Sequence, residues 1–206
     1  RQRQMCIRDS YVGTVKRRNI GFDIRQMEME DGETYDKAKQ RVVAARVEDF
    51  LDGHKTLLYY PFAGGIDMRL KTWVKPADWR LVASYYGKKD KEQKAVIVQE
   101  FKEGTKKLIV ATKAFGMGGD ISDIDRVYHV APSSTFVDYI QEIGRAARDT
   151  EIQGIAATDY HERDFYYMKR LHQTGNIAQE QLVLILRKLM EVYRMKGEKP
   201  EIMVSL

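Results

Sequence analysis

The feature that most constrains this fold is the alternation of short apolar runs with amphipathic stretches along the chain. Residues 108–110 are wholly apolar, and residues 56–60 form a second, mostly apolar run that ends at a proline. Strands that are apolar on both sides must be covered on both faces, as in a parallel sheet between helical layers. The sequence therefore predicts an α/β three-layer sandwich with a mainly parallel sheet.

Six strands, with helices between them, are expected along the chain. Strands are expected within residues 12–29 and at residues 56–60, 80–84, 107–111, 125–130 and 154–158. Helices are expected at residues 35–51, 68–74, 90–101 and 134–148. Three regions follow from this pattern: a disordered end at 1–10, a domain at 11–160, and a helical appendage at 161–206 with helices at 162–172 and 178–194.

Composition indicates a soluble globular protein with no membrane partner. The chain has 206 residues, 43% of them hydrophobic and 32% charged, and no apolar run approaches the roughly 18 residues of a membrane span. The single cysteine, Cys6, excludes an intrachain disulfide and a cysteine-rich zinc site, and it favours a reducing compartment. The net charge of +5 is concentrated in the first 20 residues, so contact with nucleic acid has to be argued from local features.

A glycine-rich loop follows the strand expected at residues 107–111. Thr112 stands at the strand tip, where its hydroxyl and N–H suit a phosphodiester oxygen. The glycines, Gly118 among them, permit a close approach of phosphate or sugar to the backbone, and Asp120 can accept hydrogen bonds from ribose hydroxyls. Such a loop, taken alone, is more often a plain tight connection.

The helix expected at residues 134–148 carries a second set of polar residues. Gln141, Arg145 and Arg148 are spaced at i, i+4 and i+7, so the spacing predicts that they project from one helix face. Two guanidiniums and an amide in this arrangement are suited to anionic oxygens. The opposite side of the helix is expected to face the core through four apolar residues: Phe136, Val137, Ile140 and Ile143. A salt-bridged surface helix is the alternative for an isolated string of this kind.

The two sets together carry a family resemblance. The order is a strand, Ala-Thr, Phe-Gly-Met-Gly, a strand, and a helix with Gln-Glu-x-Gly-Arg-Ala-x-Arg-Asp. This order resembles the second RecA-like domain of superfamily 2 nucleic-acid helicases, and most closely the RecQ-like DNA helicases. The resemblance covers roughly residues 18–158 and includes Arg18-Asn19-Ile20, residues 57–62, and Tyr85-Tyr86-Gly87. It implies a RecA-like fold.

The resemblance also implies a nucleotide site. In such motors ATP, with Mg, sits between two RecA-like domains, and this chain would supply the second wall. Arg148 resembles the arginine finger that meets the γ-phosphate, Arg145 its companion, and Gln141 the residue that couples nucleotide to motor. Gly118 and Asp120 correspond to the nucleotide-facing loop, although RecQ-like chains usually carry Asn at the position of Asp120.

The RecQ zinc module is absent, since it needs four cysteines, and the chain has no phosphate loop. The first, N-terminal RecA-like motor domain is therefore expected to be missing from this sequence and to be the partner of this chain, and this chain alone is expected to be inactive.

The expected nucleic-acid partner is single-stranded or partly duplex DNA, and the implied grip is on the backbone of single-stranded DNA. The residues that resemble it are Tyr60, Gly87, Lys88, Thr112 and Lys113. Such contacts position a strand without reading its sequence, and RNA is not excluded. The resemblance predicts a DNA helicase or translocase of the cytoplasm, associated with the nucleoid. Two alternatives are a non-catalytic RecA-like nucleic-acid-binding module and an unrelated flavodoxin-like domain. The intact set of Gln141, Arg145 and Arg148 argues against the binding module, because a protein that only binds nucleic acid needs no arginine finger. The flavodoxin-like alternative requires both motifs to be coincidental.

Overall fold

The computed structural model describes residues 19–117, 121–133, 135–149 and 151–165, and it contains one six-stranded sheet. The strand order is β1-β6-β5-β2-β4-β3, and each neighbouring pair is parallel. The predicted parallel sheet is confirmed. The strands are β1 (Ile20–Gln26), β2 (Thr56–Tyr59), β3 (Val82–Tyr85), β4 (Leu108–Ala111), β5 (Arg126–His129) and β6 (Gly154–Tyr160).

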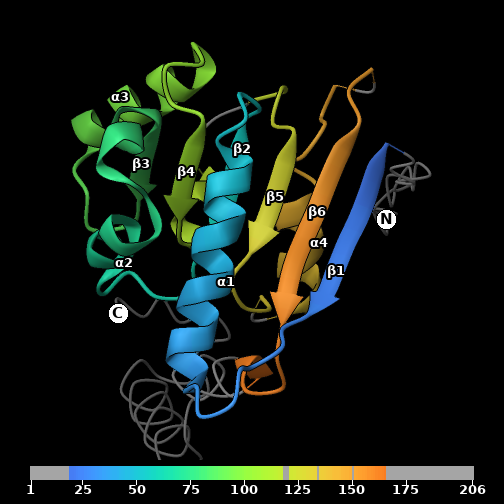
Figure 1. Cartoon of the computed structure of the whole chain (residues 1–206). Helices are drawn as coiled ribbons and strands as arrows, with labels where there is room; N and C mark the ends of the chain where they lie inside the picture. Colours follow the sequence, from blue (N-terminus) through green and yellow to red (C-terminus); the bar gives the residue numbers. More distant parts are fainter. Residues whose placement is uncertain (1–18, 118–120, 134, 150, 166–206) are drawn as a thin grey trace, which may run out of the picture.

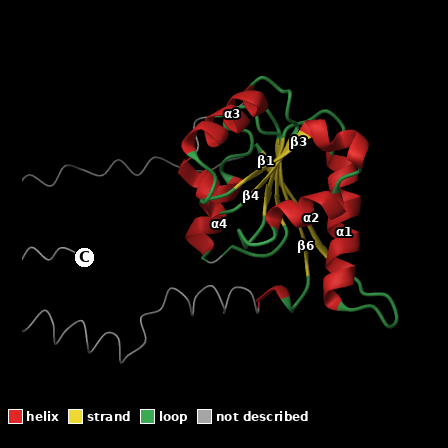
Figure 2. Ribbon diagram, turned by 90° about the vertical axis from the view of Figure 1, so that its left-hand side faces the viewer, coloured by secondary structure: helices red, strands yellow, loops and turns green. Residues whose placement is uncertain are grey.

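Helices cover both faces of this sheet (Figures 1 and 2). One face lies under α1 and α2 and the other under α3 and α4, which confirms the predicted three layers. The helices are α1 (Tyr35–Phe50), α2 (Ile66–Trp73) and α3 (Lys91–Lys102), the 3₁₀ helices η1 (Pro76–Leu81) and η2 (Lys113–Met117), and α4 (Phe136–Ile143). The expected appendage helices lie outside the described residues, except for 162–165.

Each layer contact is built by alternate residues of the central strands. Leu58 and Val110 pack with α1 and α2, whereas Leu57 and Ile109 pack with α3 and α4. All four are fully buried. Because successive strand residues point to opposite faces, only a wholly apolar run satisfies both layers, which explains why the runs at 56–60 and 108–110 are continuous.

Helix α4 is shorter than the sequence predicts. Its N-cap is Thr135, whose hydroxyl accepts a hydrogen bond from the Asp138 N–H at 3.0 Å. The helix ends at Ile143 instead of continuing to Arg148, and residues 144–147 form a turn. In this turn the Arg145 N–H donates to the Glu142 carbonyl at 3.2 Å, an i→i+3 bond. The prediction of a helix over residues 134–148 is therefore wrong in its second half.

The apolar face predicted for this helix is also wrong in part. Ile143 is buried, as expected, but Phe136 is 76% exposed, Val137 63% and Ile140 44%. The other buried residue of α4 is Glu142, which is charged. These three large apolar side chains of α4 are therefore in contact with solvent.

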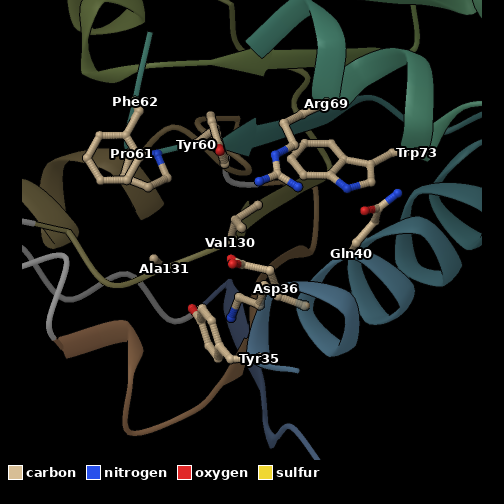
Figure 3. Close-up of a pocket in the computed structure, with 11 residues that line it drawn as sticks. Tyr35, Asp36, Gln40, Tyr60, Pro61, Phe62, Arg69, Trp73, Val130 and Ala131 are labelled. Carbon is tan, nitrogen blue, oxygen red and sulfur yellow. The ribbon is translucent and has the colours of Figure 1, made fainter. Parts of the chain in front are cut away.

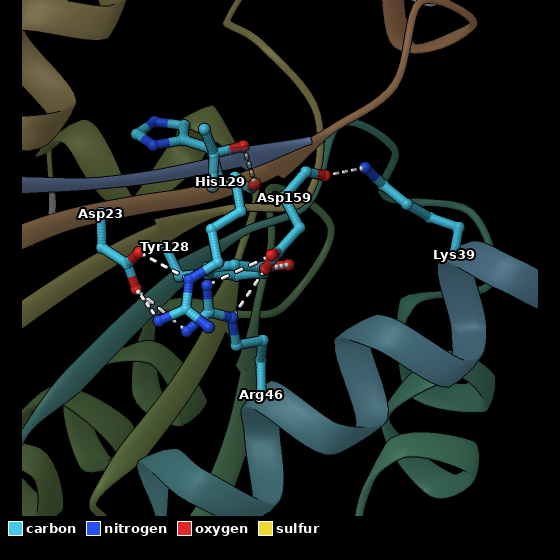
Figure 4. A network of polar contacts seen from close by, with 8 residues as sticks. Asp23, Lys39, Arg46, Tyr128, His129 and Asp159 are labelled. Atoms are coloured by element: carbon cyan, nitrogen blue, oxygen red, sulfur yellow. Dashed lines mark hydrogen bonds and ion pairs between the residues drawn. The ribbon is translucent and has the colours of Figure 1, made fainter. Parts of the chain in front are cut away.

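A buried ionic network ties α1 to β6 (Figure 4). The Arg46 guanidinium donates to both carboxylate oxygens of Asp159, at 2.7 and 3.1 Å, and to Asp23 at 3.0 Å. Lys39 donates to the Asp159 carbonyl at 2.7 Å and to the Asp164 carboxylate at 2.8 Å. Burial alone would lower the pKa of Arg46, but the two carboxylates raise it above its ordinary value. The network therefore holds its charges by mutual pairing.

Candidate nucleotide and nucleic-acid sites

The parallel strands bring three of the predicted nucleic-acid residues to one edge of the sheet. Tyr60 follows β2, Thr112 follows β4, and Gly87 lies two residues after β3. These strands are neighbours, in the order β2-β4-β3. The ladder extends to the tips, because the Tyr60 N–H donates to the Ala111 carbonyl at 2.8 Å and the Thr112 N–H to the Tyr85 carbonyl at 3.1 Å. The three residues therefore lie in a row at the C-terminal edge, where ligands of such sheets collect.

The turn after β3 is fixed from two sides. The Lys94 ammonium donates to the Gly87 carbonyl at 2.8 Å. The Tyr86 hydroxyl donates to the Asp67 carboxylate of α2 at 2.7 Å, and the Ser84 hydroxyl donates to the same carboxylate. Lys88 follows Gly87 in this turn and is exposed. The turn is therefore braced and presents a cation to solvent beside the strand tips.

Lys113, the fifth predicted nucleic-acid residue, is already paired. Its ammonium lies 2.6 Å from the Asp138 carboxylate of α4, although the Lys113 side chain is 67% exposed. The Asp138 side chain is only 13% exposed, so the pair faces solvent mainly through Lys113. The pair links the loop after β4 to the start of α4.

A pocket that the sequence did not reveal lies between the ends of β2 and β5 and helix α4. It brings Tyr60 and Lys113 together with residues that were not singled out for a role: Tyr59, Pro61, His129, Ala131, Pro132, Ser133 and Glu142. Glu142 accepts a hydrogen bond from the Ser133 hydroxyl and lies 2.9 Å from Nε2 of His129. Sequence spacing does not reveal this cluster, because His129 ends β5 and Glu142 lies on α4, and only the fold brings them together. The one signal in the sequence is that Glu142 lies within the helicase-like motif.

Tyr60 also borders a second pocket, on the α1 and α2 side (Figure 3). The Tyr60 ring meets the Trp73 ring edge-on, with centroids 5.5 Å apart. Arg69, Gln40 and Asp36 line the same pocket from α2 and α1. Tyr60 therefore stands between two hollows at the strand edge, with its ring half-buried.

The prediction that Gln141, Arg145 and Arg148 share one helix face is wrong, because only Gln141 lies on α4. Gln141 is exposed on α4, Arg145 lies in the turn, and Arg148 follows the turn and is exposed. The helical spacing fails because α4 ends at Ile143. The three residues are still close in sequence, but they leave the backbone from three different local conformations.

Arg145 points back toward the strand edge. Its guanidinium lies 5.9 Å from the centroid of the Phe115 ring in η2. Burial raises the pKa of the Tyr59 hydroxyl well above its ordinary value, even though the nearby Arg145 guanidinium lowers it. Arg145 is thus held beside the pocket that contains Tyr59 and Glu142.

Two predicted nucleotide-binding residues, Gly118 and Asp120, lie outside the described residues. Among residues 19–117, 121–133, 135–149 and 151–165, no group of three His, Cys, Asp or Glu side chains is arranged to hold a metal ion. Over the same part of the chain, no helix has the length and apolar character needed to cross a membrane.

Comparisons with known sequences agree with the resemblance inferred from the motifs. The family described as helicase conserved C-terminal domain matches residues 39–150. ATP-dependent DNA helicase Q4 of Mus musculus is 36% identical over 69 residues, which is 34% of this chain and 6% of that protein. The probable ATP-dependent DNA helicase RecS of Bacillus subtilis is 30% identical over 105 residues, 51% of this chain and 21% of that protein. The chain therefore spans only a small part of these relatives.

Solved structures show the same fold. The C-terminal domain of the DEAD-box protein Dbp5 matches with a TM-score of 0.57 and 14% identity, over 82% of this chain and 98% of that one. The DUF1998 helicase MrfA bound to DNA and AMPPNP matches with a TM-score of 0.58 and 16% identity, over 74% of this chain and 22% of that one. At such identities the likeness concerns the fold alone, and the predicted RecA-like fold is confirmed.

Proposed function

The chain belongs to the helicase C-terminal domain family, whose match covers more than half of it, and we propose on that premise that it is the second motor domain of an ATP-dependent DNA helicase or translocase. In this proposal the chain contributes arginines to a nucleotide site and part of a grip on single-stranded DNA. The phosphate loop and the main nucleotide contacts belong to a first motor domain that this sequence does not contain.

The observation that carries the proposal is the placement of Arg145 and Arg148 directly after α4. Arg145 is held against Phe115, in the loop segment that follows β4, and Arg148 is exposed beyond the turn. A cation presented across a domain boundary stabilises the charge that develops during phosphoryl transfer. We assign Arg148 the role of arginine finger, Arg145 that of its companion, and Gln141 that of coupling the nucleotide to the motor.

The nucleotide that fits these groups is ATP with Mg. The two guanidiniums suit the phosphate oxygens, and Gly118 and Asp120 are proposed to lie beside the ribose and phosphates. This chain is proposed to contact the phosphates, and the metal is proposed to be bound mainly by the first motor domain. When bound, Mg-ATP would supply the γ-phosphoryl group that is transferred to water, and its phosphates would make closure of the two domains depend on the nucleotide.

The proposed nucleic-acid grip is the row of strand tips at the C-terminal edge. Gly87 offers a backbone N–H, Thr112 a hydroxyl, Lys88 an exposed cation, and Tyr60 an aromatic ring. These are the groups that bind a sugar-phosphate backbone and stack on bases without reading sequence. Lys113 joins them if a phosphate displaces Asp138 from its ammonium.

The exposed apolar side of α4 supports a partner domain. Phe136, Val137 and Ile140 lie on the same helix that leads into Arg145. Apolar side chains gathered next to charged functional groups are typical of an interface. We propose that this side of α4 contacts the first motor domain when nucleotide closes the cleft.

The test is DNA-stimulated ATP hydrolysis by the full-length protein and its Arg148→Ala variant. Loss of the finger is expected to lower kcat by roughly a thousandfold or more, with a smaller change in nucleotide affinity. Arg163→Ala, which removes another exposed arginine outside both sites, is the matched control and is expected to keep wild-type turnover.

Two results would contradict the proposal. An Arg148→Ala variant with wild-type turnover would remove the finger assignment. A wild-type protein that binds single-stranded DNA but hydrolyses no ATP would favour the non-catalytic binding module. Parallel assays with DNA and RNA of the same sequence decide which nucleic acid the motor prefers.

A further inference from the structure

Asn19, which precedes β1, is buried and donates hydrogen bonds to a distant segment. Its side-chain nitrogen Nδ2 lies 2.8, 3.2 and 3.0 Å from the backbone carbonyl oxygens of Ala147, Asp149 and Ile152. An amide group has two N–H bonds, so one of them is shared between acceptors. All three acceptors belong to the segment that contains Arg148.

Arg148 stands between two of these acceptors. The Ala147 carbonyl belongs to the peptide unit before Arg148, so the Asn19 amide fixes that unit relative to β1. The peptide unit after Arg148 is held by the Asp149 N–H, which donates to the Ser122 carbonyl at 3.3 Å, and the Asp149 carbonyl, in the next unit, accepts from Asn19 again. The Ala147 N–H donates to the Ile124 carbonyl at 2.7 Å, which fixes the turn from a second direction. The direction in which the Arg148 side chain leaves the backbone is thus set by contacts of its neighbours.

The backbone at this point needs such bracing. Ala147 has a φ of 47°, a left-handed conformation that is unfavourable for a residue with a Cβ atom. Without the Asn19 amide, the Ala147 carbonyl loses its buried donor, and the turn can relax toward an ordinary conformation. That relaxation rotates the peptide unit before Arg148 and changes the direction of its side chain.

We infer that Asn19 is a positioning residue for Arg148, holding the finger in the geometry that phosphoryl transfer needs. This inference rests on the proposed function, in which Arg148 meets the γ-phosphate. Misplacing a catalytic group by about 1 Å can lower a rate by about 100-fold. Asn19 acts through the backbone of residues 147–149 and is not required to touch the nucleotide.

The test is a double-mutant cycle on the full-length protein, with kcat for DNA-stimulated ATP hydrolysis as the readout. The variants are Asn19→Ala, Arg148→Ala and the pair combined, and residual rates are followed with radiolabelled ATP. Asn19→Ala is expected to lower kcat by about tenfold to a hundredfold while nucleotide affinity changes less. In the Arg148→Ala background the same substitution is expected to change kcat by less than about twofold, because its target is gone.

A stability control separates positioning from loose folding. Val47→Ala removes a fully buried side chain from α1, on the other face of the sheet, and lowers the melting temperature without touching either site. At a temperature well below both transitions, Val47→Ala is expected to keep wild-type kcat. Asn19→Ser, which retains one donor, is expected to fall between wild type and Asn19→Ala, and it replaces Asn19→Ala in the cycle if that variant does not fold.

Each result decides one point. If the effects of Asn19→Ala and Arg148→Ala multiply, or if Asn19→Ala loses no more turnover than Val47→Ala, Asn19 is only a structural residue. If Arg148→Ala is inactive and Asn19→Ala is fully active, the positioning role falls and the proposed function stands. If Arg148→Ala keeps wild-type turnover, the proposed role of Arg148 falls first, and the inference about Asn19 falls with it.

Discussion

Arg46 is a buried cation on α1, and its charge is neutralised by two carboxylates far away in the sequence. Its side chain is 11% exposed and bonds Asp159 of β6 and Asp23 of β1. Arg25 also binds Asp23, at 2.8 Å, but its own side chain is 62% exposed. The two arginines share the Asp23 carboxylate, but Arg46 is buried and also pairs with Asp159, so Arg25 serves as the exposed comparison.

Arg46→Ala is expected to lower the free energy of unfolding by about 3–5 kcal/mol, because Asp159 is left as an uncompensated buried charge. Arg25→Ala is expected to cost less than about 1 kcal/mol, as exposed pairs do. Urea denaturation of the two variants beside wild type measures both values. Equal losses would show that burial does not govern this network.

Asp67 gives the stability a pH dependence. Burial raises its pKa, but the hydrogen bonds from Ser84 and Tyr86 outweigh burial and hold the pKa of Asp67 below the ordinary 3.8. A carboxyl whose folded pKa is depressed contributes stability that is present above 3.8 and is lost as pH falls through the folded pKa.

Asp67→Asn is therefore expected to be less stable than wild type at pH 7, and the difference is expected to shrink as the pH is lowered toward 2. Urea denaturation of both proteins from pH 7 to pH 2 measures it. A difference that stays constant with pH would contradict the depressed pKa of Asp67.

At the scale of elements, the turn after α4 packs unusually closely on the start of β6. A Cβ atom added to Gly154 would lie 2.8 Å from the Cβ of Ala147 and 3.0 Å from that of Ala146. Glycine is needed here for close approach and not for its backbone angles, since Gly154 is not among the residues with positive φ. Ala147, which has a left-handed backbone, thus packs directly against Gly154.

Gly154→Ala is expected to cost about 1–3 kcal/mol of unfolding free energy through overpacking. The same substitution is expected to cost at least about 1 kcal/mol less in an Ala147→Gly background, where the closest Cβ is absent and the left-handed strain is relieved. Thermal and urea unfolding of the four proteins in this cycle give the coupling.

Gly21→Ala is the control for that cycle. Gly21 is also a strand glycine, on β1, but its added Cβ would meet only the Gly154 carbonyl, at an ordinary 3.8 Å. It is expected to change stability by less than about 0.5 kcal/mol. Additive costs for Gly154→Ala and Ala147→Gly would show that the close contact is not the cause.

At the scale of the whole molecule, the fold makes contacts beyond the domain end expected at residue 160. Asp164 is fully buried, accepts hydrogen bonds from Lys39 and Tyr35, and accepts the His161 N–H at 2.8 Å. Burial lowers the pKa of Lys39, and Asp164 is the group that opposes this shift. We propose that the stable unit extends at least to residue 165.

A fragment of residues 19–165 is accordingly expected to be more stable than one of residues 19–160, by about 3 kcal/mol or more, because the shorter fragment leaves Lys39 buried without its carboxylate. Thermal unfolding of the two fragments measures the difference. Equal melting temperatures would place the domain end at residue 160 after all.

The sequence by itself determined the sheet, the layers and the family. Apolar runs such as residues 108–110 specify a doubly covered strand within a few residues, and the motifs around Thr112 and Arg148 can be read directly from the order of residues. These signals are local, so they need no knowledge of what packs around them. Gly87, Thr112 and Tyr60 reached one edge of the sheet because parallel strands all end on the same side.

Only the tertiary structure decided where α4 ends and which of its sides is buried. The turn at residues 144–147 is held by the carbonyl of Ile124 and by the amide of Asn19, which is 128 residues from Ala147 in sequence. Helical spacing placed Arg148 on a helix face, although Gly144, the C-cap of α4, lies between Gln141 and Arg145. Burial of Glu142 and exposure of Phe136 likewise depend on partners supplied by other elements, and the sequence around a residue does not contain its partners.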